Sequence, residues 1–289
     1  MGLRADHAAL MERYLAQFAG GPAPRAFYDD DYVEVYPQSG EQVAGPSRAI
    51  EAIRRQPADV TIAGTPQLAS LGEDRVLVEA LFDYGGPRWW MVALFETNAG
   101  RLHRTTAYFG EPFEAPAWRA AWAERFDPLD PAAWDGDGDG QPVEEAEVDR
   151  VVKAAIGGDI EVVRAMAHPD YRGSFPQSGE RFDLAGLEAV DAHYPGGLPE
   201  MELNWLAGAT ERWIVNPANV PVRVTGGGDI WAAEVLLRYP SGERYFGVTV
   251  QLYRERRVWR QRYYYFAPFE AASFRGDLVD RIDPGTVLG

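Results

Sequence analysis

Two glutamates stand out because each lies inside a run of apolar residues. Glu79 lies in the sequence VLVEALF, and Glu234 lies in IWAAEVL. Apolar surroundings disfavour an ionised carboxylate and raise its pKa toward values that suit proton transfer. Glu79 and Glu234 are therefore candidate general acids or bases. The alternative is that strand alternation turns them toward water or toward an arginine, for which Arg104 and Arg260 are candidate partners.

His103 is a further acid–base candidate, because an imidazole ordinarily titrates near neutral pH. The remaining histidines, His7, His168 and His193, do not combine with it into a metal-binding spacing, and the chain has no cysteine. Neither a glycine-rich phosphate loop nor a nucleophile elbow is present in the sequence. We therefore predict no metal, no thiol chemistry and no cofactor.

The composition limits the class of partner. The chain has 289 residues, a formal net charge of −16 and a pI near 4.7. Nucleic acids and anionic membranes attract basic surfaces, so neither is an expected partner. The start of the chain lacks the apolar core of a signal peptide, and no apolar run approaches the length of a membrane span. With cysteine also absent, we expect a cytoplasmic protein.

The sequence contains the same unit twice. Residues 37–41 read PQSGE and recur at 176–180, and residues 112–115 read PFEA and recur at 268–271. Two identities in the same order indicate a duplication.

The repeat divides the chain into parts. We place the first copy at 1–130, an acidic Gly/Asp linker at 131–146 and the second copy at 147–289. The linker sequence DGDGDGQP resembles the start of a calcium-binding EF-hand loop. Ala146, however, stands where such a loop requires a bidentate glutamate. A flexible linker is therefore the prediction.

Each copy is predicted to be an α+β unit, with helices first and an antiparallel meander after them. Ser47 is a candidate N-cap of the third helix. The second copy has extra length between Pro195 and Asp229, where glycines 226–228 indicate a loop. In the first copy the predicted helices are 7–18, 24–28 and 47–55, and the strands are 32–36, 75–84, 89–96 and 102–109. In the second copy the helices are 148–156, 161–167 and 184–193, and the strands are 230–239, 245–254 and 258–266.

Helices on one face of a curved sheet leave a cone whose mouth can accept a small apolar ligand. Aromatic residues fill the long strands, and alternation sends half of them to each face. One face is expected to line the cone, and the other to pack the two units into an internal pseudo-dimer. For Gln38 and Gln177 the alternative is a turn in which they satisfy backbone groups. The candidate ligand-binding residues are Tyr36, Gln38, Trp90, Arg104, Gln177, Phe246 and Arg260.

The order of elements, the strand exit YVEVYPQSGE and the ending YFGEPFEAP together resemble the nuclear transport factor 2-like superfamily, in its SnoaL-like branch. The resemblance covers nearly the whole chain as two copies, and it implies two tandem cone domains. Its members include ketosteroid isomerases, polyketide cyclases, dehydratases, epoxide hydrolases and non-catalytic binders. The resemblance therefore says more about fold than about activity.

Within that resemblance, Tyr14 stands where ketosteroid isomerases carry an oxyanion-binding tyrosine. Their catalytic base is an aspartate directly before the strand-ending proline, and here Tyr36 and Phe175 occupy that position. Because the base is missing from both copies, a packing role for Tyr14 is favoured over a catalytic one.

The functional expectation is a cofactor-free protein that binds a small hydrophobic molecule in a cone-shaped pocket, as an isomerase, cyclase or hydrolase. Under it Tyr14, Glu79, His103 and Glu234 are the catalytic candidates. The alternative is a non-catalytic binding or assembly module whose cones are filled. The units are expected to pair within one chain, which is then a monomer or a homodimer.

Overall fold

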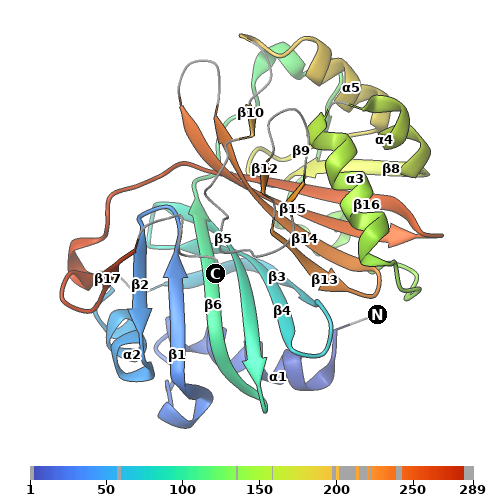
Figure 1. Ribbon diagram of the computed structural model, residues 1–289. Coiled ribbons are helices and arrows are strands. Elements are labelled where there is room, and N and C mark those ends of the chain that lie inside the picture. The colour runs from blue at the N-terminus through green and yellow to red at the C-terminus, as the bar shows by residue number, and fades with distance from the viewer. Residues whose placement is uncertain are drawn as a thin grey trace.

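Two α+β units make up the protein, and their sheets lie back to back with the helices on the outer faces (Figure 1). The computed structural model describes residues 3–56, 60–134, 136–157, 159–196, 200–201, 213–214, 220–221, 223–238 and 243–282. Most of the predicted extra length of the second copy lies outside these residues. None of the helices in the described ranges has the length and apolar character needed to span a membrane.

The first unit packs its helices on a seven-stranded sheet of order β17-β2-β1-β6-β5-β4-β3. Its strands pair antiparallel except for β1 and β6, which run parallel. Its elements are α1 (Ala5–Phe18), η1 (Arg25–Phe27), β1 (Tyr28–Tyr36), β2 (Glu41–Ala44), α2 (Pro46–Arg54), β3 (Thr61–Ser70), β4 (Arg75–Asp83), β5 (Arg88–Asn98) and β6 (Arg101–Gly110). The segment after it holds η2 (Ala117–Arg119), β7 (Glu124–Arg125) and η3 (Pro131–Ala133).

The second unit repeats this order on a sheet whose path is β10-β14-β15-β16-β8-β9-β7, with β13 also paired to β14. Here β16 and β8 form the parallel pair. Its elements are α3 (Glu145–Gly157), α4 (Ile160–Met166), β8 (Ala167–Phe175), β9 (Glu180–Phe182), α5 (Leu184–Ala192), β10 (Glu200–Met201), β11 (Trp213–Ile214), β12 (Val220–Pro221), β13 (Arg223–Gly227), β14 (Ile230–Arg238), β15 (Arg244–Arg254) and β16 (Arg257–Phe266). The chain then continues through η5 (Ser273–Arg275) to β17 (Asp280–Arg281).

Three local features differ from the sequence-based expectations. Ser47 does not cap α2, because Gly45 is the N-cap at φ 86° and Pro46 takes the first helical position. β3 was not predicted, since Gly64 and Pro66 interrupt its sequence; its register shifts where they lie, and it is an edge strand, where such residues are tolerated. The glycines assigned to a loop lie partly in β13, where a Cβ on Gly226 would come within 2.6 Å of the Trp231 ring.

The two sheets share one buried apolar cluster. In β4, Leu77 and Leu81 face the second unit, whereas the residues next to them face the helices of the first unit. Leu236 and Val248 in β14 and β15 come to the same cluster from the other side. Burial of large apolar side chains from both sheets is the main force holding such layers together.

Each unit also lends a strand to the other. β7, which follows the first unit, pairs with β9 of the second sheet, with Glu124 opposite Arg181. β17, at the end of the second unit, pairs with β2 of the first sheet, with Asp280 opposite Gln42. Figure 1 shows the red β17 beside the blue β2. We call residues 111–134 the first arm and residues 267–282 the second arm.

The predicted linker, residues 131–146, contacts the second unit at several points. The Gly140 amide donates to the Asp229 carboxylate at 2.8 Å, and the Glu255 amide donates to Asp139 at 2.8 Å. A Cβ on Gly138 would approach the Asp229 carboxylate within 2.2 Å. The glycines here permit a close approach that a larger residue would block.

Candidate functional site

Glu79 and Glu234 both lie between the two sheets rather than in a cone. The Arg262 Nε and Nη2 atoms donate to the two oxygens of Glu79 at 2.8 and 2.5 Å, and the Tyr264 hydroxyl donates to it at 2.8 Å. The Tyr108 hydroxyl donates to Glu234 at 2.8 Å. Both carboxylates are almost fully buried. The arginine partner of Glu79 therefore comes from the other unit, and it is neither Arg104 nor Arg260.

The candidate ligand-binding aromatics on the long strands share that location. Trp90 lies 5.8 Å from the Tyr264 ring, and Phe246 lies 6.1 Å from the Tyr108 ring, centroid to centroid. Trp90 and Phe246 belong to the cluster shared by the sheets. Their contacts join the units.

The two PQSGE motifs form turns, and each turn binds the arm that comes from the other unit. Gln38 exchanges hydrogen bonds with the Phe109 backbone at 2.6 and 2.7 Å and donates a further one to Ala267 O of the second arm. Gln177 does the same with Tyr265 of its own unit, and it donates to Glu111 O of the first arm at 3.2 Å. The glutamines therefore satisfy backbone groups.

The glutamate of each motif binds an arginine of the opposite arm. Arg119 contacts both oxygens of Glu180 and lies over the Phe175 ring at 5.0 Å. Arg275 donates to Glu41 at 2.8 Å. Both glutamates are fully buried, at 0% exposed. Sequence reasoning missed both arginines, although they stand at the same distance after each PFEA sequence.

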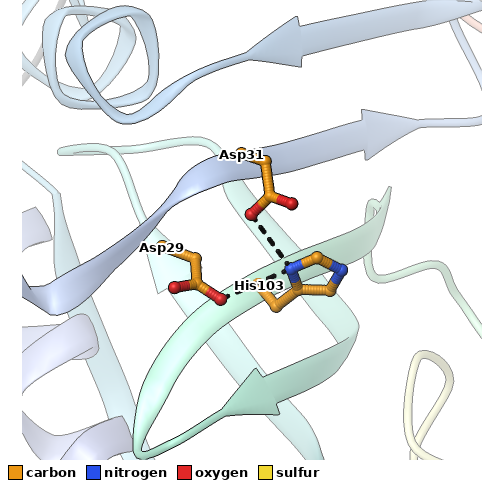
Figure 2. Close-up of side chains that lie close together, drawn as sticks. All are labelled: Asp29, Asp31 and His103. Carbon is orange, nitrogen blue, oxygen red and sulfur yellow. Dashed lines mark ion pairs between the residues drawn. The ribbon is translucent and has the colours of Figure 1, made fainter.

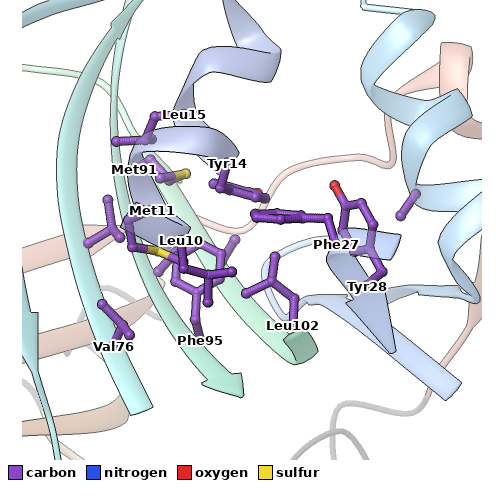
Figure 3. Packing of buried hydrophobic residues seen from close by; sticks show 14 of the residues in the cluster. Leu10, Met11, Tyr14, Leu15, Phe27, Tyr28, Val76, Met91, Phe95 and Leu102 are labelled. Atoms are coloured by element: carbon purple, nitrogen blue, oxygen red, sulfur yellow. The ribbon is translucent and has the colours of Figure 1, made fainter. Parts of the chain in front are cut away.

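The cone of the first unit is filled by side chains (Figure 3). Tyr14, Phe27, Tyr28 and Met11 are each no more than 1% exposed. The Tyr14 ring packs edge-on against Phe95 with the centroids 4.7 Å apart. These contacts give Tyr14 a core position.

A buried carboxyl group that sequence reasoning missed lies in the same cone. The Tyr14 hydroxyl is 3.5 Å from Glu34 Oε1, and Tyr36 also hydrogen-bonds this carboxylate. Desolvation by burial raises the pKa of Glu34, although these tyrosines and Arg275 act in the opposite direction. Arg275 lies over the Tyr36 ring at 4.4 Å. Tyr36 is thus a wall of the filled cone, next to the second arm.

Replacing Glu34 with glutamine is expected to stabilise the protein at pH 7–8 by on the order of 1 kcal/mol. Because the folded state raises the pKa of Glu34, its ionisation opposes folding. Below the ordinary pKa of glutamate, Glu34 is protonated in the folded and in the unfolded state, and its destabilising effect disappears. The gain of Glu34→Gln should therefore vanish near pH 4, which urea unfolding at several pH values measures. An equal effect at all pH values would contradict this assignment.

His103 belongs to a small ionic cluster near the starts of the neighbouring strands β1 and β6, which Figure 2 shows. Its Nδ1 lies 3.5 Å from Asp29 and 3.4 Å from Asp31. Arg101 forms an ion pair with Asp29 at 2.5 Å, and Asn98 donates to Asp29 at 2.9 Å. The spacing would allow a metal ion, but Arg101 already supplies the positive charge that a cation would bring.

The two arginines among the ligand-binding candidates lie on equivalent strands. Arg260 donates to Asp170 O at 2.5 Å and stacks on the Trp259 ring at 3.9 Å. Arg104 lies on β6, in register with Val33 of β1. The structure does not bring Arg104 or Arg260 to the large cavity described next.

The second unit, in contrast, contains a large cavity of about 1590 Å³ on the helical side of its sheet. Apolar and aromatic side chains make up most of its lining. The first arm completes its wall through Phe113, Trp118 and Arg119. Of the predicted site residues, Gln177 is the one found among the described lining residues. Further lining residues include Val151, Val163, Leu187, Val235, Tyr245, Thr249 and Tyr265.

Polar groups gather at one part of this cavity. The Tyr171 hydroxyl donates to Gln261 at 2.9 Å and lies 3.1 Å from the Tyr263 hydroxyl. Asp191 of α5 also lines the cavity. Desolvation, with a smaller contribution from Glu188, raises the pKa of Asp191 to about 6. Asp191 is an exposed residue that lines an apolar cavity, and a carboxyl group whose pKa is raised in such a place is a candidate functional group.

Comparison with known proteins gives similar structures without close sequence relatives. No family model and no curated protein matches the chain. A nuclear transport factor 2-like protein of unknown function from Burkholderia xenovorans is 25% identical; the match covers 42% of this chain and 95% of that one, with a TM-score of 0.38. A putative ketosteroid isomerase from Kribbella flavida is 23% identical; the match covers 40% of this chain and 87% of that one, with a TM-score of 0.36. An LEH-like epoxide hydrolase from M. tuberculosis is 23% identical; the match covers 36% of this chain and 83% of that one, with a TM-score of 0.30.

The structure itself shows the fold. In each unit two helical segments precede a strand, a further helix follows, and a meander of antiparallel strands closes a sheet that surrounds a cone. In each unit the strand that precedes the further helix pairs parallel with the last long strand: β1 with β6, and β8 with β16. The chain therefore has the fold of the nuclear transport factor 2-like superfamily, present in each of its two units.

Proposed function

We propose that the protein binds a small, mainly apolar molecule in the cone of its second unit. The observation that carries this proposal is the cavity of about 1590 Å³ with its largely apolar lining. Ligand sites in proteins are typically concave and apolar with a few polar groups in fixed positions. Here Asp191, Tyr171 and Gln261 supply such groups. The volume leaves room for a ligand of the size of a typical metabolite.

The first unit has a different role in this proposal. Its cone is filled by side chains such as Tyr14 and Tyr32, and its arm supplies Phe113 and Trp118 to the wall of the second cone. The two units thus act as an internal pseudo-dimer in which one unit supports the ligand site of the other. The first unit thus corresponds to the second sequence-based hypothesis, a non-catalytic module whose cone is filled, whereas the second unit does not.

Replacing Thr249 with tryptophan is expected to block ligand binding. Thr249 lies at the centre of β15, between Ala233 and Tyr263, and lines the cavity. An indole at this position would occupy the middle of the cavity, so apolar ligands should bind at least about tenfold more weakly. The measurement is the fluorescence of N-phenyl-1-naphthylamine, which is uncharged at pH 7.5 and brightens in apolar sites.

The matched control is Thr61→Trp, at an exposed position of β3 in the first unit. It adds the same side chain outside the cavity and should leave binding of the dye unchanged. Absence of dye binding by the unmodified protein, or equal binding by the Thr249→Trp variant, would overturn the proposed function.

A further inference from the structure

The cavity of the second unit is lined by two carboxylates of α5 that differ in their contacts. The Glu188 carboxylate is held by Arg164 through two hydrogen bonds of 2.8 and 2.7 Å. Asp191 lies nearby on the same helix and also lines the cavity. Among the residues that the structure describes, no hydrogen bond or ion pair reaches the Asp191 carboxylate. Asp191 is an exposed residue, so a ligand that enters the cavity can reach its carboxylate.

The cations of the described lining do not compensate for this charge. Arg119 binds Glu180, and Arg164 binds Glu188 and Glu161. Glu111 adds a further acidic group to the lining. The charge of the described lining is therefore negative, and it favours a positively charged group on the ligand.

Three tyrosines line the same cavity as Asp191. They are Tyr171, Tyr263 and Tyr265, and the charge of Asp191 contributes, after burial, to the raised pKa of each of them. The Tyr171 hydroxyl donates to Gln261, and in that arrangement Tyr263 donates to Tyr171. These two hydroxyl protons are therefore not directed to Asp191. The faces of electron-rich rings attract cations.

We propose that Asp191 and the neighbouring tyrosines form a subsite for a positively charged nitrogen, so that the ligand of the second cone is a hydrophobic amine. The inference rests on the proposed function, because it specifies the ligand of the same cavity. The carboxylate pairs with the ammonium group, the rings of Tyr171, Tyr263 and Tyr265 surround it, and the apolar walls take the hydrocarbon part.

The subsite predicts a pH dependence with a definite sign. Among the described residues, Glu188 on the same helix, Tyr171 on β8 and Tyr263 and Tyr265 on β16 are the titratable groups that interact electrostatically with Asp191. With a pKa of about 6, Asp191 is largely protonated at pH 5 and ionised at pH 7.5. An alkylammonium ion stays charged over this range. Its affinity should therefore rise from pH 5 to pH 7.5, while that of a neutral analogue stays constant.

The test compares nonylamine with nonan-1-ol as competitors of N-phenyl-1-naphthylamine. At pH 7.5 we expect the amine to displace the dye at about tenfold lower concentration than the alcohol, the factor of a charge-assisted contact. Asp191→Asn should remove this difference and the pH dependence while the dye still binds. Asp170→Asn, an exposed position on β8 outside the cavity, is the matched control and should retain both.

The outcomes separate the two proposals. If the dye binds but the amine and the alcohol displace it equally, the amine subsite is overturned and the apolar site stands. An unchanged preference for the amine in Asp191→Asn likewise overturns the assignment to Asp191. If the dye does not bind, both proposals fall.

Discussion

Replacing Arg119 with methionine is expected to lower the free energy of unfolding by about 3–5 kcal/mol, the usual cost of leaving a buried charge unpaired. Glu180 is 0% exposed and receives Arg119 on both of its oxygens. Methionine keeps apolar contact with the ring of Phe175, over which Arg119 lies at 5.0 Å. The substitution removes the charge, so that among the described residues Ser178 would remain as the side-chain donor to the Glu180 carboxylate, at 2.6 Å.

The matched control is Arg48→Met. Arg48 forms an ion pair of 3.2 Å with Asp280, and the two side chains are 46% and 56% exposed. Exposed pairs contribute about 0–1 kcal/mol, so this variant should unfold at nearly the same urea concentration as the unmodified protein. A loss for Arg119→Met no larger than that for Arg48→Met would show that the arm contact does not stabilise the fold.

The same comparison applies to the second arm. Arg275→Met leaves Glu41 buried at 0% exposed, and the loss should be similar to that of Arg119→Met. A similar loss at both sites would mean that the reciprocal arms stabilise the two units equally. The two PQSGE motifs and the arginines after PFEA are then explained by the contacts that hold each arm to the opposite unit. Their recurrence in both copies would follow from this structural role and would not imply that both copies bind the same ligand.

The strands and helices were predictable because their apolar patterns are strong. β4, β5 and β6 begin and end within two residues of the predicted ranges. The face of β4 on which the Glu79 side chain lies was not predictable from such a pattern. Every residue of β4 except its two ends is buried, so the sequence is a continuous apolar run and does not distinguish the cone face from the face toward the other unit.

The candidate site depended on contacts between residues far apart in the sequence. Asp191 lies in a predicted helix, but its place in a cavity depends on the β-strands and on the first arm, which no local pattern reports. Glu34 was overlooked because it follows an acidic stretch of β1 whose earlier residues, Asp30 and Asp31, are exposed. The arginines of the arms were visible in the repeat, but the strand exchange that brings Arg119 to Glu180 was not.

The second large effect is expected at the interface between the sheets. Arg262→Met should destabilise the protein by about 3–5 kcal/mol, because it leaves Glu79 buried at 1% exposed without its cation. The Tyr264 hydroxyl still donates to the carboxylate, at 2.8 Å, but a single neutral donor does not replace a bidentate guanidinium. Urea unfolding measures the loss.

A compensating variant separates the burial of an unpaired charge from loss of packing. Glu79→Leu, Arg262→Met and Tyr264→Phe together remove the charges and the hydroxyl donor, and they leave an apolar interface of similar volume. Such replacements of buried ion pairs are often neutral or stabilising, so the triple variant should recover most of the stability lost by Arg262→Met alone. A triple variant as unstable as Arg262→Met would contradict the electrostatic explanation.

The Glu79→Gln variant distinguishes a structural role of Glu79 from a catalytic one. Glu79→Gln removes the carboxylate charge opposite Arg262, whose side chain is 13% exposed, and should cost about 3 kcal/mol. Because Glu79 lies between the sheets and not in the second cone, dye binding by the folded variant should equal that of the unmodified protein. Loss of ligand binding with unchanged stability would instead support the sequence-based hypothesis that Glu79 acts on a ligand, and would require a ligand path to the interface between the sheets.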